Sequence, residues 1–254
     1  MKGHFVAEPA TPDLILAMDT SGDVCSVALL RGGRLQMELN FRHEMRLSER
    51  LLAHVDMLLD ECAATLDEVD GFAVGVGPGS FTGTRIGVVT VKTWAHLLPR
   101  PVVAIGSLHA LAAEYAGLRG AIVVPVLPCR SGVVYTAAYT VDAELPAELL
   151  APAALSFAEL GAALAAYPDH AILFCGPTAR RYDAELRGSL GNRSDETAFG
   201  AAEYPRAGTI GRLALARLRA ADPLPPALEL TPLYVSPPPI STPKSPLPSP
   251  PATS

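Results

Sequence analysis

The spacing of apolar residues along the chain predicts two successive α/β units. Short apolar runs predict strands, and apolar residues repeated every three or four positions predict helices. The first unit is expected to contain strands at 14–19, 25–31, 34–39, 71–76 and 102–105 and helices at 46–63, 80–98 and 107–116. The second is expected to contain strands at 121–127, 132–141, 170–174 and 229–235 and helices at 156–166, 177–187 and 207–221. Strands that alternate with helices place both units in the α/β class.

The two ends of the chain differ from these units. The first residues include no apolar run of signal-peptide length, and the residues after Val235 read SPPPISTPKSPLPSPPATS. A stretch so rich in proline and serine neither buries apolar area nor forms strand pairs. We therefore expect four regions, namely a flexible segment at 1–13, subdomains at 14–117 and 118–235, and a disordered tail at 236–254.

Composition and charge favour a compact protein that does not bind nucleic acid by itself. Of the 254 residues, 49% are hydrophobic, which is enough to bury a sizeable core. The formal net charge is −6, and the sequence contains no run of lysine and arginine with interleaved aromatic residues. The charge pattern of an autonomous nucleic-acid binder is therefore missing. Because no apolar run approaches the roughly 20 residues of a membrane span, we expect a cytoplasmic protein that contacts no membrane.

A glycine-rich turn, GFAVGVGPGSFTGTRIGVVTVK, connects a predicted strand to a predicted helix. Gly77, Gly79 and Gly83, with the hydroxyls of Ser80 and Thr82 between them, leave the N–H groups at the helix start unobstructed. Such a turn can hold an anion or let another backbone approach closely. A P-loop needs a lysine directly after its last glycine, and a dinucleotide turn needs an acid after the next strand. Both are absent, so an anion site and simple close packing remain as the two alternatives.

A predicted hairpin near the amino terminus, LILAMDTSGDVCSVALLR, carries further polar side chains. Asp19, Thr20 and Ser21 follow its first strand directly, and Gly22 and Asp23 form its turn. The hairpin therefore presents one carboxylate and two hydroxyls at its tip.

Histidine, cysteine and serine spacing argues against a metal site or a nucleophile. No two of the six histidines stand four apart, the spacing that puts two imidazoles on one face of a helix. The four cysteines are far apart, and we expect them to be reduced structural residues. No G-x-S-x-G turn occurs, and Ser80 is expected to cap a helix. We therefore assign no catalytic residue and no metal ligand.

The two long helices of the first unit differ in pattern. In the first, Leu51, Val55 and Leu58 belong to an ordinary apolar stripe opposite charged residues. In the second, apolar residues surround nearly the whole circumference, and they include the four residues Val88, Val91, Trp94 and Leu98. A helix that lies on one sheet needs apolar residues only on the side that faces the sheet. The second helix is therefore either enclosed in the fold or in contact with another protein.

Four segments, in this order and spacing, resemble the TsaB family, also called YeaZ. They are LILAMDTSGDVCSVAL, SERLLAHVDMLLDE, GVGPGSFTGTRIGVVTVK and VVAIGSLHALA. The resemblance implies an actin-like ATPase (ASKHA) fold made of two RNase H-like subdomains. It further implies a non-catalytic bacterial subunit that helps to install threonylcarbamoyl on the adenosine beside the anticodon of certain tRNAs.

The resemblance also implies partners and contact residues. The partners are a TsaD-like catalytic subunit and a TsaE-like ATPase, with a homodimer formed in the absence of the partner and tRNA contacted only through the complex. The contacts use the two long helices, and we expect them at Leu51, Val55, Leu58, Val88, Val91, Trp94 and Leu98.

In the wider superfamily, the hairpin and the glycine-rich turn face a metal-nucleotide. The corresponding residues here are expected to form vestigial phosphate loops, and they are Asp19, Thr20, Ser21, Gly77, Gly79, Ser80, Thr82 and Gly83. No cofactor is expected to be required, and the binding of ATP or ADP is left open.

Three positions depart from the family pattern. Leu47 replaces a histidine common before the SERLL run, Ala53 replaces a proline after it, and Pro128 stands where an aspartate is usual. The resemblance therefore assigns no role to these three positions. Two alternatives therefore stay beside the family assignment, an actin-like ATPase or kinase that acts alone and a metallopeptidase of the superfamily type, although histidine spacing argues against the latter.

Overall fold

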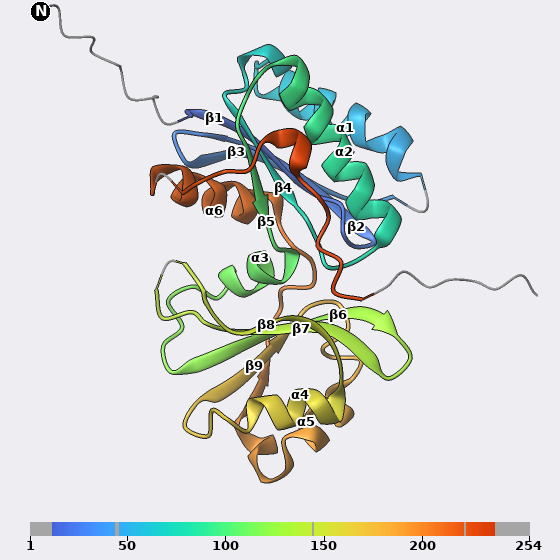
Figure 1. The fold of residues 1–254 in the computed structure, drawn as a ribbon, viewed down its shortest axis with the longest axis vertical. Coiled ribbons are helices and arrows are strands. Elements are labelled where there is room, and N and C mark those ends of the chain that lie inside the picture. The colour runs from blue at the N-terminus through green and yellow to red at the C-terminus, as the bar shows by residue number, and fades with distance from the viewer. Residues whose placement is uncertain (1–11, 44–45, 144, 221, 237–254) are drawn as a thin grey trace, which may run out of the picture.

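Two five-stranded sheets form the frame of the computed structural model, which describes residues 12–43, 46–143, 145–220 and 222–236 (Figure 1). The first sheet contains β1 (Leu14–Asp19), β2 (Val24–Arg31), β3 (Arg34–Arg42), β4 (Gly71–Gly75) and β5 (Val102–Ile105). The second contains β6 (Ala121–Arg130), β7 (Val133–Thr140), β8 (Ala147–Ser156), β9 (Ala171–Cys175) and β10 (Thr197–Phe199). The helices are α1 (Leu47–Glu61), α2 (Phe81–Leu97), α3 (Ser107–Ala113), α4 (Phe157–Leu164), α5 (Asp183–Ser189) and α6 (Ala207–Arg219). Three short 3₁₀ turns are η1 (Leu66–Glu68), η2 (Gly191–Glu196) and η3 (Ala227–Glu229).

The two sheets share one topology. The strand orders are β3-β2-β1-β4-β5 and β8-β7-β6-β9-β10, so each sheet follows the order 3-2-1-4-5 in its own strands. In each, the first three strands are antiparallel neighbours, and the last two add in parallel. This repeated arrangement confirms the predicted α/β fold of the actin-like ATPase class.

The central strand β1 is buried on both faces, which explains its unbroken apolar sequence LILAMD. Leu16 and Met18 face the layer that contains α1 and α2, whereas Ile15 and Ala17 face α6 on the other side. The first sheet is therefore covered by helices on both faces (Figure 1). Among the described residues, no helix combines the length and apolar character needed to cross a bilayer.

Helix α6 packs on the first sheet, and this corrects the expected division of the chain. Residues 207–221 were predicted to belong to the second subdomain, but Ile210 and Ala214 of α6 are buried with residues of β1, β2, β4 and β5. Gly211 permits the approach, because a side chain there would overlap Leu30. An amphipathic pattern shows that a helix has an apolar face, but it does not specify which sheet that face covers.

Other expectations for the second half were also partly wrong. The strand predicted at 229–235 is the 3₁₀ turn η3 followed by an irregular segment, and β8 and β10 were not predicted. The helix predicted at 177–187 occurs as the shorter α5. The predicted flexible segment at 1–13 and disordered tail at 236–254 lie outside the described residues except for 12, 13 and 236.

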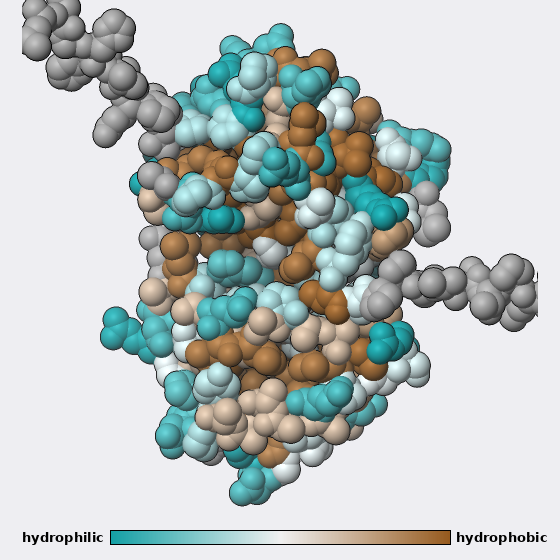
Figure 2. Space-filling model, in the orientation of Figure 1, coloured by the Kyte–Doolittle hydropathy of each residue, from teal (hydrophilic) through white to brown (hydrophobic). Residues whose placement is uncertain are grey.

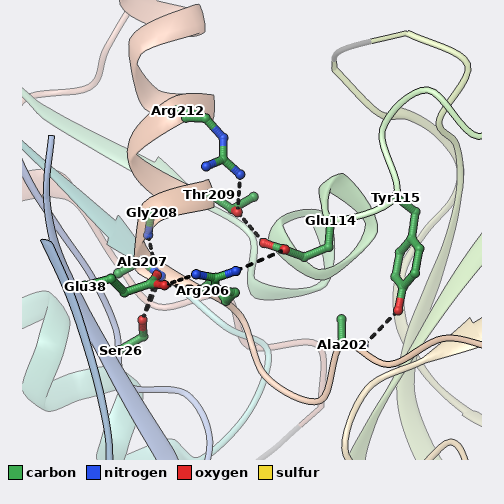
Figure 3. Close-up of polar contacts among 10 residues, drawn as sticks. All are labelled: Ser26, Glu38, Glu114, Tyr115, Ala202, Arg206, Ala207, Gly208, Thr209 and Arg212. Atoms are coloured by element: carbon green, nitrogen blue, oxygen red, sulfur yellow. Dashed lines mark hydrogen bonds and ion pairs between the residues drawn. The ribbon is translucent and has the colours of Figure 1, made fainter. Parts of the chain in front are cut away.

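The start of α6 is fixed by polar contacts to the first sheet and to α3 (Figure 3). Glu38 of β3 accepts a hydrogen bond from the Gly208 N–H at 2.8 Å and forms an ion pair with Arg206. The Ala207 N–H donates to Ser26 Oγ at 2.8 Å. Glu114, directly after α3, accepts a hydrogen bond from the Thr209 hydroxyl. Glu38 therefore satisfies both a free N–H of the helix start and the charge of Arg206.

Candidate functional site

The structure brings together the hairpin and the glycine-rich turn that the sequence singled out. Strands β1 and β4 are parallel neighbours, so Asp19 at the end of one lies beside Gly75 at the end of the other. The turn between β4 and α2 then passes over the hairpin tip, where the Ser80 N–H donates to the Ser21 carbonyl oxygen at 2.6 Å. Residues predicted from two separate motifs therefore form one contiguous cluster.

Asp19 is fully buried, and both of its carboxylate oxygens accept hydrogen bonds from within the chain. Oδ1 accepts from the Ser21 N–H at 2.8 Å and from the Ser21 hydroxyl at 2.7 Å. Oδ2 accepts from the Ser107 hydroxyl at 2.7 Å, and Ser107 Oγ in turn accepts from the Gly77 N–H at 3.1 Å. Burial raises the pKa of the Asp19 carboxyl, while the hydrogen bonds from Ser21 and Ser107 partly oppose that shift.

The glycines of the turn allow two backbones to pack directly against each other. A side chain on Gly79 would overlap the Ser21 carbonyl oxygen, and one on Gly83 would overlap the Thr20 carbonyl oxygen. The Thr20 hydroxyl donates to the Gly83 carbonyl oxygen at 2.8 Å. Of the two alternatives that the sequence left for these glycines, close packing is therefore the one that the structure shows.

This packing corrects the expected orientation of the phosphate-loop residues. Asp19 and Thr20 have no exposed surface, and Ser21 is 3% exposed. Gly77 is buried as well, and only Ser80 and Thr82 present exposed side chains from this set. A metal-nucleotide site needs carboxylate and hydroxyl oxygens that face open space. Asp19, Thr20 and Ser21 do not fit that requirement, because their side-chain oxygens are used within the fold, whereas Asp23 of the hairpin turn and Ser80 border the cavity described below.

Ser80 is the N-cap of α2, as predicted. Its hydroxyl oxygen accepts a hydrogen bond from the Gly83 N–H at 3.1 Å. Capping boxes also begin η1 and α4, with Glu159 accepting from the Ser156 N–H and Glu68 accepting from the Thr65 N–H, both at 2.8 Å.

Replacement of Ser80 by alanine is expected to lower the free energy of unfolding by about 1 kcal/mol, since one N–H at the start of α2 loses its acceptor. Urea denaturation measures this change. Thr82, an exposed hydroxyl residue in the same turn, gives the matched control, and Thr82→Ala should change stability by less than half as much. Equal effects of the two variants would contradict the capping role.

A cavity of about 640 Å³ lies beside this cluster and is lined from both halves of the chain. The first half contributes Arg42 and Phe81, and the second contributes Tyr135 and Arg181. The segment 233–236 also lines it, and the Tyr135 hydroxyl and Ser236 Oγ are 3.0 Å apart in a hydrogen bond. Ser21, Gly79 and Ser80, which the sequence singled out, also line the cavity. Sequence reasoning missed the other lining residues, because they come from separate elements and meet only in the folded chain.

The predicted contact residues of the two long helices are mostly inside the fold. Leu51, Val55 and Leu58 of α1 and Val88 and Val91 of α2 are at most 2% exposed and pack against the first sheet. Their assignment as surface contacts is wrong, because the regular apolar stripe of each helix is the side that faces the sheet. Trp94 and Leu98 are half-buried against the same core.

Other apolar residues of these helices lie on the outside. On α1, Leu52 and Met57 are 50% and 53% exposed. On α2, Val89 and Leu97 are 59% and 69% exposed. Apolar residues therefore occur on the outer side of α2 as well, but they share it with Thr82, Arg85, Thr93 and His96, and they are not the residues predicted to make the contact.

The four cysteines are free thiols. Cys25 and Cys175 are buried, and burial raises the pKa of both thiols. Within the described ranges, histidine, cysteine, aspartate and glutamate side chains form no group of three or more that could hold a metal ion.

Comparison with known proteins adds to this geometry. Residues 43–172, which include α1, the glycine-rich turn and α2, match the family model TsaD, tRNA N6-adenosine threonylcarbamoyltransferase. The tRNA threonylcarbamoyladenosine biosynthesis protein TsaB of Bacillus subtilis is 38% identical over 125 residues, which are 49% of this chain and 54% of that protein. TsaB of Escherichia coli is 33% identical over 129 residues, which are 50% and 55% of the two chains. These alignments span about half the length of the curated relatives.

A solved structure extends the likeness to nearly the whole fold. YeaZ from Pseudomonas aeruginosa superposes with a TM-score of 0.73 at 30% sequence identity, over 87% of this chain and 99% of that one. The chain belongs to the TsaB (YeaZ) family. The likeness to YeaZ covers both sheets, whereas the sequence matches to curated TsaB proteins cover about half of the chain.

Proposed function

We propose that this chain is a non-catalytic subunit that binds and activates a TsaD-like partner in the synthesis of N6-threonylcarbamoyladenosine in tRNA. The outer face of α2 carries this proposal, since Val89 and Leu97 are more than half exposed in a chain that belongs to the TsaB family. Aliphatic side chains exposed at this level along one helix favour a protein interface. A TsaE-like ATPase and tRNA would join through the complex, and the net charge of −6 supports indirect tRNA binding.

The hairpin tip supports a non-catalytic role. Asp19, Ser21 and Ser107 bind one another, so their polar groups are not directed toward a substrate. Activation of the partner would then come from contact between the subunits, and the outward apolar face would be buried in that contact.

Reconstitution tests this function. The chain alone should form no threonylcarbamoyladenosine. Mixed with a TsaD-like subunit, a TsaE-like ATPase, the enzyme that makes threonylcarbamoyl-adenylate and tRNA, it should raise modification from near zero. Modification of tRNA, sustained ATP hydrolysis or proteolysis by the chain alone would contradict the proposal.

Val89→Glu tests the surface itself. A carboxylate buried in an apolar interface without a partner costs several kcal/mol, on the order of 3, so the dissociation constant for the TsaD-like subunit should rise at least 100-fold and modification should stop. Isothermal titration measures the affinity. Leu118→Glu is the control, because Leu118 is a leucine 41% exposed outside α1 and α2. The thermal midpoint of both variants should match that of the wild type, and near-normal affinity of Val89→Glu would exclude this face of α2.

A further inference from the structure

The segment that follows α6 returns to the first sheet and lies along α2, and residues 227–236 of it are called the strap here (Figure 1). Its first part is the 3₁₀ turn η3, in which residues three apart lie on one side. Accordingly, Ala227 packs against the core of the first sheet and Leu230 is 6% exposed in that core. Leu228, between them, is turned outward and is 63% exposed.

The strap engages both cations of α2. The Arg85 Nε–H donates to the Tyr234 hydroxyl at 2.7 Å, and the Arg85 guanidinium stacks 3.8 Å from the centre of the Phe81 ring. Lys92 Nζ donates to the Leu230 carbonyl oxygen at 3.0 Å. These contacts hold the lysine and the arginine of α2 against the strap, although Arg85 remains exposed.

Two threonine hydroxyls of α2 are bonded to carbonyl oxygens of their own helix. Thr90 Oγ1 donates to the Ile86 carbonyl oxygen at 2.8 Å, and Thr93 Oγ1 donates to the Val89 carbonyl oxygen at 2.9 Å. A threonine whose hydroxyl is bonded to its own helix presents mainly its methyl group. Val89, Thr93 and Leu97 stand four apart and therefore form one apolar stripe on the outer side of α2, flanked by the exposed Arg85 and His96. Figure 2 shows apolar side chains on the face of the molecule that carries α2 and η3.

We propose that Leu228 extends the partner surface, so that the TsaD-like subunit docks on three elements, α1, α2 and η3. This inference rests on the proposed function. Leu228 lies on the turn that packs directly beside α2, and like Val89 and Leu97 of α2 it is an aliphatic residue more than half exposed. The strap thus has two roles in the interface, because it fixes the positions of Arg85 and Lys92 and adds an exposed leucine to the surface.

The charged side chains around this surface indicate which kind of partner can bind to it. Asp56 and Asp60 are exposed on α1, beside the apolar surface. In the described part of the chain, the lysines and arginines of this region are already engaged, with Arg46 bound to Glu49, Arg50 bound to a backbone carbonyl, and Arg85 and Lys92 bound to the strap. A second copy would bring the same carboxylates, while its lysine and arginine side chains in this region are directed to acceptors within its own chain. The surface therefore fits a different chain, with an apolar helix pair flanked by lysine or arginine.

Leu228→Glu tests the strap. Isothermal titration of the full chain with the TsaD-like subunit should show a dissociation constant at least tenfold higher than the wild type, with an unchanged thermal midpoint. Leu118→Glu should stay within twofold of the wild type. Leu228→Ala, which adds no charge, should raise the constant severalfold.

The outcomes separate this inference from the proposed function. If Val89→Glu abolishes binding while Leu228→Glu stays within twofold of the wild type, the strap is outside the interface and only the inference fails. If neither variant weakens binding, the docking face assigned to the proposed function fails as well. Sedimentation of the isolated chain gives one more criterion, because a Leu228→Glu effect confined to a homodimer, with the complex intact, would overturn the inference.

Discussion

Replacement of Gly83 by alanine is expected to destabilise the protein by about 3 kcal/mol, although helix propensity alone predicts the opposite sign. Alanine in a helix is favoured over glycine by about 1 kcal/mol. Gly83, however, is buried in the first turn of α2, and a Cβ there would overlap the carbonyl oxygen of Thr20. Overpacking of this kind typically costs about 1–3 kcal/mol, with the upper end expected where the overlapping atom is backbone. Steric overlap therefore outweighs propensity.

Gly188 is the matched control for this prediction. It also lies within a helix, α5, but no atom lies within 4 Å of a Cβ built there. Gly188→Ala is therefore expected to raise the free energy of unfolding by about 0.5–1 kcal/mol. Urea denaturation should show a lower free energy of unfolding than the wild type for Gly83→Ala and a higher one for Gly188→Ala. A Gly83→Ala variant as stable as the wild type would show that the hairpin and the turn are not packed as described.

The glycine-rich turn illustrates what the sequence alone can predict. Three glycines between a strand and a helix indicated a position where a backbone or an anion comes close, and Ser80 was correctly assigned as the helix cap. The neighbour that comes close, the carbonyl oxygen of Thr20, is 63 residues away from Gly83 in the chain. The local sequence indicates that another group comes close to a glycine. Which group that is depends on how the strands pair.

The helices show the same limit. The apolar stripe of α1 was predicted correctly, and its side chains pack on the sheet. The interface residues were wrong, because a stripe at helical spacing marks the buried side, whereas an interface uses the apolar residues that remain outside, such as Val89 and Leu97. The placement of α6 on the first sheet depends on Glu38 and Ser26, which are 170 and 181 residues away from their partners in the helix start. The sequence pattern of α6 alone cannot predict contacts with residues so far away in the chain.

The buried carboxyl of Asp19 is expected to give the protein a specific dependence of stability on pH. In an unfolded chain an aspartate titrates near pH 4, at a pKa of about 3.9. In the folded protein burial raises the pKa of Asp19, so the folded state holds its proton more tightly. Below the unfolded pKa the carboxyl is protonated in both states and contributes no pH dependence. As the pH rises from there to the folded pKa, the unfolded state releases the proton first, and stability falls.

Asp19→Asn isolates this effect, because amide and carboxyl have nearly the same shape and the amide does not titrate. The stability of the wild type minus that of Asp19→Asn should therefore decrease as the pH rises above about 4, with a limiting slope of about 1.4 kcal/mol per pH unit, and then become constant above the folded pKa. Urea denaturation at pH values from 3 to 8 measures the difference. The hydrogen bonds from Ser21 and Ser107 favour the ionised carboxyl and limit the size of the decrease. If the difference instead increases with pH, those three bonds outweigh burial, and the hairpin tip holds a stabilised anion.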